Sequence, residues 1–182
     1  MKASWFVRKM IQWRFKMTSR EKGVAQIRTC MQGYLDLLNG LTDEQARKSV
    51  RVEKMLGVDE DMREWSLCEI IEHNIIVNHT LKARVLSLLT GEISPEYEHF
   101  DVKRDVMPGL GDAFEKSDID QFTASVDGYL ESIAEFDSLK TTATAEHPIF
   151  GKFDAHQFHI MFAFHLNLHL RQAIAVVDLV RK

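Results

Sequence analysis

The chain of 182 residues has little cysteine, little proline and little net charge: two cysteines, three prolines and a net charge of −4. Two cysteines cannot form the disulfide framework of a small secreted protein, and a weakly acidic chain gives no overall argument for nucleic-acid binding. No apolar run approaches the roughly 18–20 residues of a membrane-spanning helix. Arg8, Lys9 and Arg14 interrupt any secretory signal in the first 17 residues. We therefore expect a cytoplasmic protein that binds no nucleic acid.

Hydrophobic residues make up 45% of the chain, which is enough for the core of a single globular domain. Apolar residues recur at three-to-four spacing, without proline, in four long segments, and no segment shows convincing strand-like alternation. The long segments are residues 19–38, 66–90, 118–136 and 155–181. Residues 141–154 are interpreted as a loop. The pattern predicts an all-α fold, a four-helix bundle with a long connection over residues 92–117.

The weak net charge conceals an uneven distribution. Residues 1–30 carry eight basic residues and one acidic residue, a balance of +7, so the remaining chain sums to −11. Residues 4–16 predict a short basic amphipathic helix that carries Trp5, Phe6, Trp13 and Phe15. This helix has two interpretations: contact with an anionic membrane through residues 1–17, or docking on its own chain or on a second copy. We favour docking, because bundle dimers bury such aromatic residues.

Three of the eight histidines fall on apolar helix faces. His165 and His169 are four residues apart in the last helix, and His73 lies near the middle of the second long helix. A core-facing imidazole is costly unless its nitrogens find partners, and a divalent metal is one such partner. Neutral histidines accept Zn, Ni, Fe or Mn. The alternative is that all three are hydrogen-bonded core histidines, because a histidine pair at this spacing is by itself a weak motif.

Two polar residues flank these histidines at helical spacing. Glu69 precedes His73 by one turn and could orient a histidine or act as a general base; the alternative is a capping box with Ser66. Gln172 follows His169 by three residues and could bind a substrate; the alternative is a polar residue at the edge of the core. The remaining five histidines are interpreted as structural or as loop and surface residues: His79, His99, His147, His156 and His159.

Two blocks of the sequence resemble the DinB/YfiT-like superfamily. WSLCEIIEH at 65–73 resembles its Trp-Ser-x-x-Glu-hydrophobic-x-x-His block. HPIFGKFDAHQF at 147–158, followed by HLNLHLRQ at 165–172, resembles its C-terminal block. The resemblance covers residues 20–180 in outline and is close only at the two blocks. It therefore divides the chain into an N-terminal helix at 1–18 and a bundle domain at 19–182.

The resemblance implies an up-down-down-up bundle and a divalent metal site formed by His73, His165 and His169. It further implies a homodimer. Members with known activity act with low-molecular-weight thiols, as bacillithiol S-transferases or mycothiol-dependent isomerases. A cation held by three neutral ligands keeps its full charge, so a thiol that binds it ionises near neutral pH.

Three functions are compatible with these residues. The first is a metal-dependent enzyme that activates a low-molecular-weight thiol for transfer to a small electrophile, with a hydrolase that uses metal-bound water as a variant. The second is a non-catalytic metal-binding or sensor protein. The third is a helical interaction protein with structural histidines. The first is our prediction, and the sequence does not identify the thiol, the electrophile or the metal.

Overall fold

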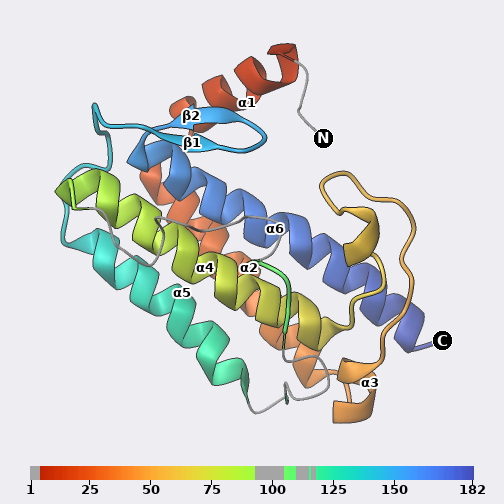
Figure 1. Cartoon of the computed structure of the whole chain (residues 1–182). Coiled ribbons are helices and arrows are strands. Elements are labelled where there is room, and N and C mark those ends of the chain that lie inside the picture. Colours follow the sequence, from red (N-terminus) through yellow and green to blue (C-terminus); the bar gives the residue numbers. More distant parts are fainter. Residues whose placement is uncertain (1–4, 93–104, 110–114, 116–117) are drawn as a thin grey trace.

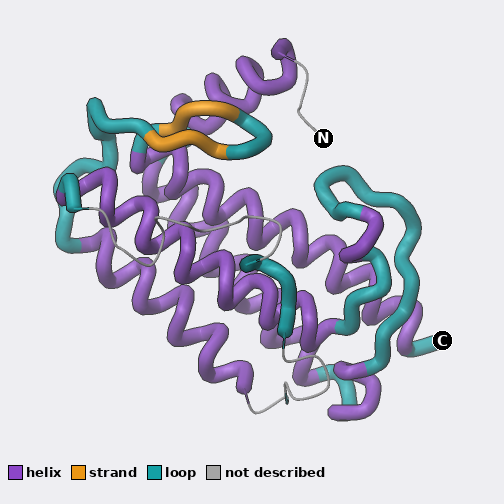
Figure 2. The backbone as a smooth tube through the Cα atoms, in the orientation of Figure 1, coloured by secondary structure: helices purple, strands orange, loops and turns teal. Residues whose placement is uncertain are grey.

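The structure, a computed structural model, describes residues 5–92, 105–109, 115 and 118–182 (Figures 1 and 2). It is mostly helical, as expected, and short helices and a two-stranded hairpin lie between the long helices along the chain. The elements are α1 (Trp5–Met17), α2 (Arg20–Asn39), α3 (Asp43–Arg47), a 3-10 helix η1 (Glu60–Met62), α4 (Leu67–Thr90), α5 (Ile119–Ala134), β1 (Ala145–His147), β2 (Gly151–Phe153) and α6 (Ala155–Val180).

Local capping residues determine where the long helices begin and end. The Ser66 side chain accepts a hydrogen bond from the Glu69 backbone N–H at the start of α4, and Asp154 does the same for Gln157 at the start of α6. Both are capping boxes, which satisfy backbone donors that have no partner within the helix. Gly91 ends α4 with a φ of 78°, a left-handed conformation that glycine adopts without steric cost.

The four long helices form a bundle with up-down-down-up topology. Helix α2 packs against α6, α6 against α4, and α4 against α5. Asn78 bonds to Ser125 and Lys82 to the Gly128 carbonyl, so successive turns of α4 and α5 pair in the same order and the two helices are parallel. Helices α2 and α6 run in the opposite direction (Figure 1). Parallel neighbours require a connection that crosses the length of the bundle, and the described residues 105–109 belong to this crossover.

Helix α6 is the most apolar of the four long helices. Among the described helices it alone is long and apolar enough to cross a membrane by length and composition, but more than half of its most apolar segment is buried. It packs against both α2 and α4, which is the behaviour of a core helix. Large aromatic side chains fill the core beside it, including Tyr34, Phe122, Tyr129 and Phe162.

A short β-hairpin interrupts the segment expected to be a loop. Strands β1 and β2 pair antiparallel, with Glu146 opposite Lys152. The expectation of a loop at 141–154 was therefore wrong over these residues. Three-residue strands are too short to show alternation, which is read over four to eight residues.

Helix α1 packs on this hairpin and on the first turns of α6. The buried Phe15 ring lies 5.6 Å from the rings of both Phe153 and Phe164. The Gln12 amide donates to the Phe150 carbonyl, and the Gln157 amide donates to the Gln12 carbonyl. One face of α1 is thus part of the core of the chain.

Candidate metal centre

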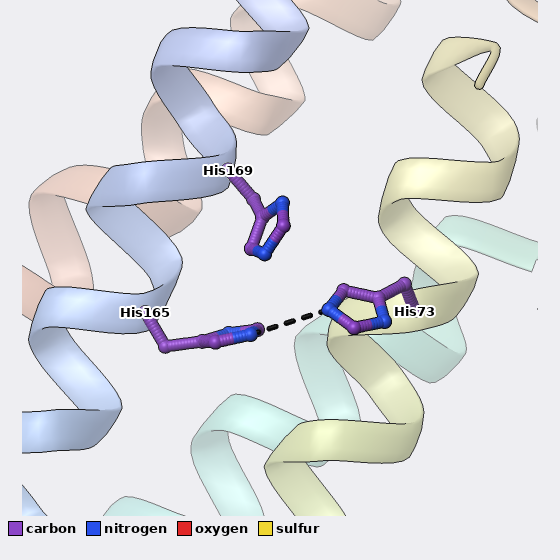
Figure 3. Close-up of side chains that lie close together, drawn as sticks. All are labelled: His73, His165 and His169. Carbon is purple, nitrogen blue, oxygen red and sulfur yellow. Dashed lines mark hydrogen bonds between the residues drawn. The ribbon is translucent and has the colours of Figure 1, made fainter. Parts of the chain in front are cut away.

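Three imidazoles from two helices meet inside the bundle. His73 extends from α4, and His165 and His169 extend from successive turns of α6 toward it (Figure 3). One nitrogen from each ring lies within 4.8 Å of the other two. His73 and His169 are only 2% and 3% exposed, and His165 is half-buried. The described part of the structure thus brings together the three histidines that the sequence predicts as metal ligands.

The main chain of the crossover segment orients His73. Its Nδ1 lies 2.6 Å from the Val106 carbonyl oxygen. A carbonyl oxygen only accepts, so Nδ1 carries the proton and donates it. The Nε2 atom is left with its lone pair, and this atom faces the other two rings (Figure 3). An oxygen acceptor of this kind is the usual partner of a metal-ligating histidine.

A buried glutamine orients His169 in the same manner. The Gln172 amide nitrogen donates to the Met62 carbonyl at 2.7 Å, which fixes the orientation of the amide group. Its Oε1 atom then accepts a hydrogen bond from His169 Nδ1 at 2.9 Å. His169 Nε2 therefore also presents a lone pair. Gln172 is fully buried, and both ends of its amide are bonded within the protein.

His165 completes the cluster from one turn earlier on α6. Its Nε2 atom lies 3.2 Å from His73 Nε2. Two nitrogens that bind one tetrahedral metal at about 2.0–2.1 Å are about 3.3 Å apart, so these two atoms are already at a suitable separation. His165 Nδ1 is buried and has no hydrogen-bond partner among the described residues. With the lone pair on His73 Nε2, the hydrogen bond between these two atoms has His165 Nε2 as its donor, so metal binding would require the His165 proton to sit on Nδ1 instead.

Burial keeps all three imidazoles neutral. It lowers the pKa of His169 to about 3, with a further contribution from the positive charge that His73 would carry. Burial also lowers the pKa of His73, and it holds the pKa of His165 well below its ordinary value, again with neighbouring histidines as the second cause. Neutral rings at physiological pH are the protonation state that metal binding needs.

These observations fit a divalent cation. Two lone pairs are fixed by hydrogen bonds on the opposite side of each ring, the third ring is at ligand spacing, and His73 and His169 are buried. The Trp65 ring, 5.0 Å from the ring of His73 and itself buried, forms one wall of the site. The His73, His165 and His169 cluster could therefore hold a metal ion.

Glu69 lies at the start of α4, where its contacts are those of a cap. Its carboxylate accepts from the Ser66 backbone N–H at 2.7 Å and from the Ser49 hydroxyl at 3.4 Å. These hydrogen bonds form the capping box that the Ser66–Glu69 spacing indicated as the alternative to a catalytic role. A catalytic role for Glu69, and substrate binding by Gln172, stay predictions.

Two further residues contribute to the site, and only one of them has a signal in the sequence. The Val106 carbonyl has none because a main-chain contact does not depend on residue type. Glu72, next to His73, is 5% exposed and accepts a hydrogen bond from the Gly109 backbone N–H. It therefore ties the crossover to α4 beside the Val106–His73 bond. The signal that could have identified Glu72 is an acidic residue within an otherwise apolar stretch of a helix.

The remaining histidines serve the fold or lie elsewhere. His156 and His159 are buried and bond to the main-chain carbonyls of Thr18 and Arg20. His147 ends β1 and accepts backbone hydrogen bonds in the hairpin turn, and His79 is exposed. His99 lies outside the described residues.

The comparison with protein families identifies the fold. Residues 26–173 match the family model of the DinB superfamily, a stretch that includes all three clustered histidines. The chain belongs to the DinB superfamily. Comparisons with curated proteins and with solved structures give no match. The DinB match leaves α1 outside its limits, so this helix is an addition to the part that the family model describes.

Proposed function

We propose that this DinB protein binds one divalent metal through His73, His165 and His169 and uses it to activate a low-molecular-weight thiol for transfer to a small electrophile. The observation that supports the metal site is the meeting of three neutral imidazoles whose outer nitrogens are already bonded on two of the three rings. A cation in this position supplies the Lewis acidity that lowers the pKa of a bound thiol or water.

The chain's own residues have distinct tasks in this proposal. Val106 and Gln172 hold the rings of His73 and His169 in the ligating orientation. Trp65 limits the access of water to His73. The thiol loses its proton to solvent, its sulfur forms a bond to the electrophilic carbon, and the leaving group departs with the electrons of the bond that breaks.

The metal site is tested by metal analysis of untagged protein. We expect about one divalent ion per wild-type chain and strong loss of it in His169→Ala, because a structural triad loses most of its affinity with one ligand removed. His79→Ala is the matched control, because His79 is an exposed histidine of the same bundle. A wild type without metal, or a His169→Ala protein that holds as much as wild type, contradicts the site.

The reaction is tested by turnover assays of the metal-loaded protein with a panel of thiols and electrophiles. We expect product only when a thiol is present, and none with His169→Ala. Turnover without thiol would instead assign a hydrolase that uses water. Stoichiometric metal without turnover under any condition would assign a non-catalytic metal-binding protein.

A further inference from the structure

Helix α1 has two faces of opposite character. Val7, Ile11 and Phe15, four residues apart, lie on the face that meets the hairpin and α6, and Phe15 is only 3% exposed. The ring contacts of Phe15 and the two Gln12 hydrogen bonds fix α1 through this face. The orientation of the opposite face is thereby fixed as well.

The opposite face carries large apolar side chains that no described residue covers. At about 100° per residue they occupy an arc of about 140° around the helix. Their exposed fractions are Trp5 73%, Phe6 70%, Met10 51%, Trp13 65% and Met17 67%. Scattered single exposed apolar residues are ordinary, but five on one side of a 13-residue helix form a patch that indicates a binding surface.

Positive charge lies within this patch and beside it. At the same spacing around the helix, Lys9 and Lys16 fall between Trp5 and Trp13, and Arg14 lies about 40° beyond Met10; all three cations are exposed. Helix α1 contains no acidic residue. Arg8, on the docked side, lies 3.8 Å from Glu146 of the hairpin, whereas no ion pair among the described residues involves Lys9, Arg14 or Lys16.

We propose that the exposed face of α1 binds the anionic surface of a lipid bilayer. Two tryptophans and a phenylalanine beside cationic side chains are the composition of helices that lie at the headgroup boundary, with aromatic rings among the acyl chains and cations at the phosphates. A second protein surface fits less well, because lysine is depleted from protein interfaces and its charge is costly to desolvate there.

The distribution of charge over the chain would orient the protein on such a surface. Residues 1–30 sum to +7 and the rest of the chain to −11. An anionic bilayer attracts the first part and repels the second, so the stable orientation places α1 on the lipid and the bundle away from it. In Figure 1, α1 lies on the outer side of the hairpin at one end of the bundle, so the bundle does not stand between α1 and a membrane surface in this orientation.

Vesicle co-sedimentation of the full chain tests the proposal. We expect binding to vesicles of phosphatidylcholine mixed with phosphatidylglycerol, much weaker binding to phosphatidylcholine alone, and release at ~1 M salt, where charges are screened within about 3 Å. Lys9→Glu with Lys16→Glu should weaken binding by about 30-fold or more, because each surface cation contributes about 1 kcal/mol. Trp13→Ser should weaken it at unchanged charge.

The matched control is Lys48→Glu with Lys140→Glu, a pair of exposed lysines outside α1 that changes the net charge equally. It should bind as wild type does, because the proposal places the contact on α1. Deletion of α1 is unsuitable, since Phe15 belongs to the core. Equal loss in the two double variants would assign a general charge effect and overturn the proposal. Absence of vesicle binding by wild type, or a dimer in sedimentation analysis that Trp13→Ser abolishes without any vesicle binding, would also overturn it.

Discussion

At the scale of single residues, hydrogen bonds on the outer side of the rings decide which nitrogen each imidazole presents. The Val106 carbonyl oxygen accepts a hydrogen bond from His73 Nδ1, and the Gln172 amide oxygen accepts one from His169 Nδ1. In both cases the acceptor is itself held, by the main chain or by the bond from Gln172 to the Met62 carbonyl. Gln172 therefore transmits the position of the segment before α4 to a ring on α6.

Removing this amide should weaken the metal site without removing a ligand. We expect Gln172→Ala to lower the affinity for a divalent metal by about 10–100-fold, because His169 loses both its orientation and the acceptor for its Nδ1 proton. Competition titration against a chromogenic chelator measures the change. Gln32→Ala, at an exposed glutamine of α2, is the control and should bind as wild type does. Equal affinities of all three proteins would show that Gln172 does not position His169.

The three histidines could be predicted from the sequence, but their partners could be predicted only in part. The spacing of His165 and His169 and the resemblance around His73 do not depend on distant contacts. The acceptor for His73 is the Val106 main-chain oxygen, and a contact of this kind depends on tertiary packing rather than on a local pattern. The spacing from His169 indicated Gln172 as a candidate. Its hydrogen bond to His169 could not be predicted, because it depends on the side-chain orientation that the bond to the Met62 carbonyl fixes.

At the scale of elements, a glycine lets α2 approach α6 closely at one level of the bundle. His159 of α6 is bonded to both the Tyr129 hydroxyl and the Arg20 carbonyl, so its ring cannot move aside easily. A Cβ atom on Gly23 of α2 would lie 2.5 Å from His159 Nε2 and 2.9 Å from the Ile160 Cδ1 atom. This helical glycine is therefore required by packing.

Alanine at this position should destabilise the bundle despite its higher helix propensity. We expect Gly23→Ala to lower the free energy of unfolding by about 1–3 kcal/mol through overpacking. Gly128→Ala should instead raise it by up to about 1 kcal/mol, because its Cβ would meet only Lys82 Nζ at 3.6 Å. Urea denaturation of the two variants and wild type measures both changes. A Gly23→Ala protein more stable than wild type would show that the His159 ring moves aside to accommodate the added Cβ.

The helix ends were predicted well because capping is local. Ser66, Thr42 and Asp154 cap the helices that follow them, each with its reciprocal partner three residues on. The hairpin could not be predicted in this way. Its pairing of Ala145 with Phe153 joins segments without alternation, and α1 and α6 stabilise it from outside through Phe15 and Phe158.

At the scale of the whole molecule, buried neutral histidines couple folding to pH. Burial lowers the pKa of His159 to about 4, against 6.5 for an unperturbed histidine. Below pH 6.5 the unfolded chain takes up this proton and the folded chain does not. The stability contribution is therefore complete above pH 6.5 and is lost as the pH falls toward 4.

We expect His159 alone to lower the free energy of unfolding by about 2 kcal/mol between about pH 7 and pH 5. Urea denaturation of the chelator-treated protein across this range measures the slope. His159→Gln should flatten it, because glutamine can replace a hydrogen bond but does not titrate. His79→Gln, at an exposed histidine, should keep the wild-type slope. Identical slopes for all three proteins would assign the pH dependence to other groups.

The parallel pairing of α4 and α5 has a consequence for how the metal site can change. It obliges the chain to cross the bundle between them, and that crossover supplies the main-chain oxygen that orients His73. No side-chain substitution at residue 106 can delete a backbone carbonyl. Selection can therefore adjust this acceptor only by changing the length or path of the connection. Insertions and deletions between residues 91 and 118, rather than point mutations there, are the changes by which the reactivity of the centre would diverge.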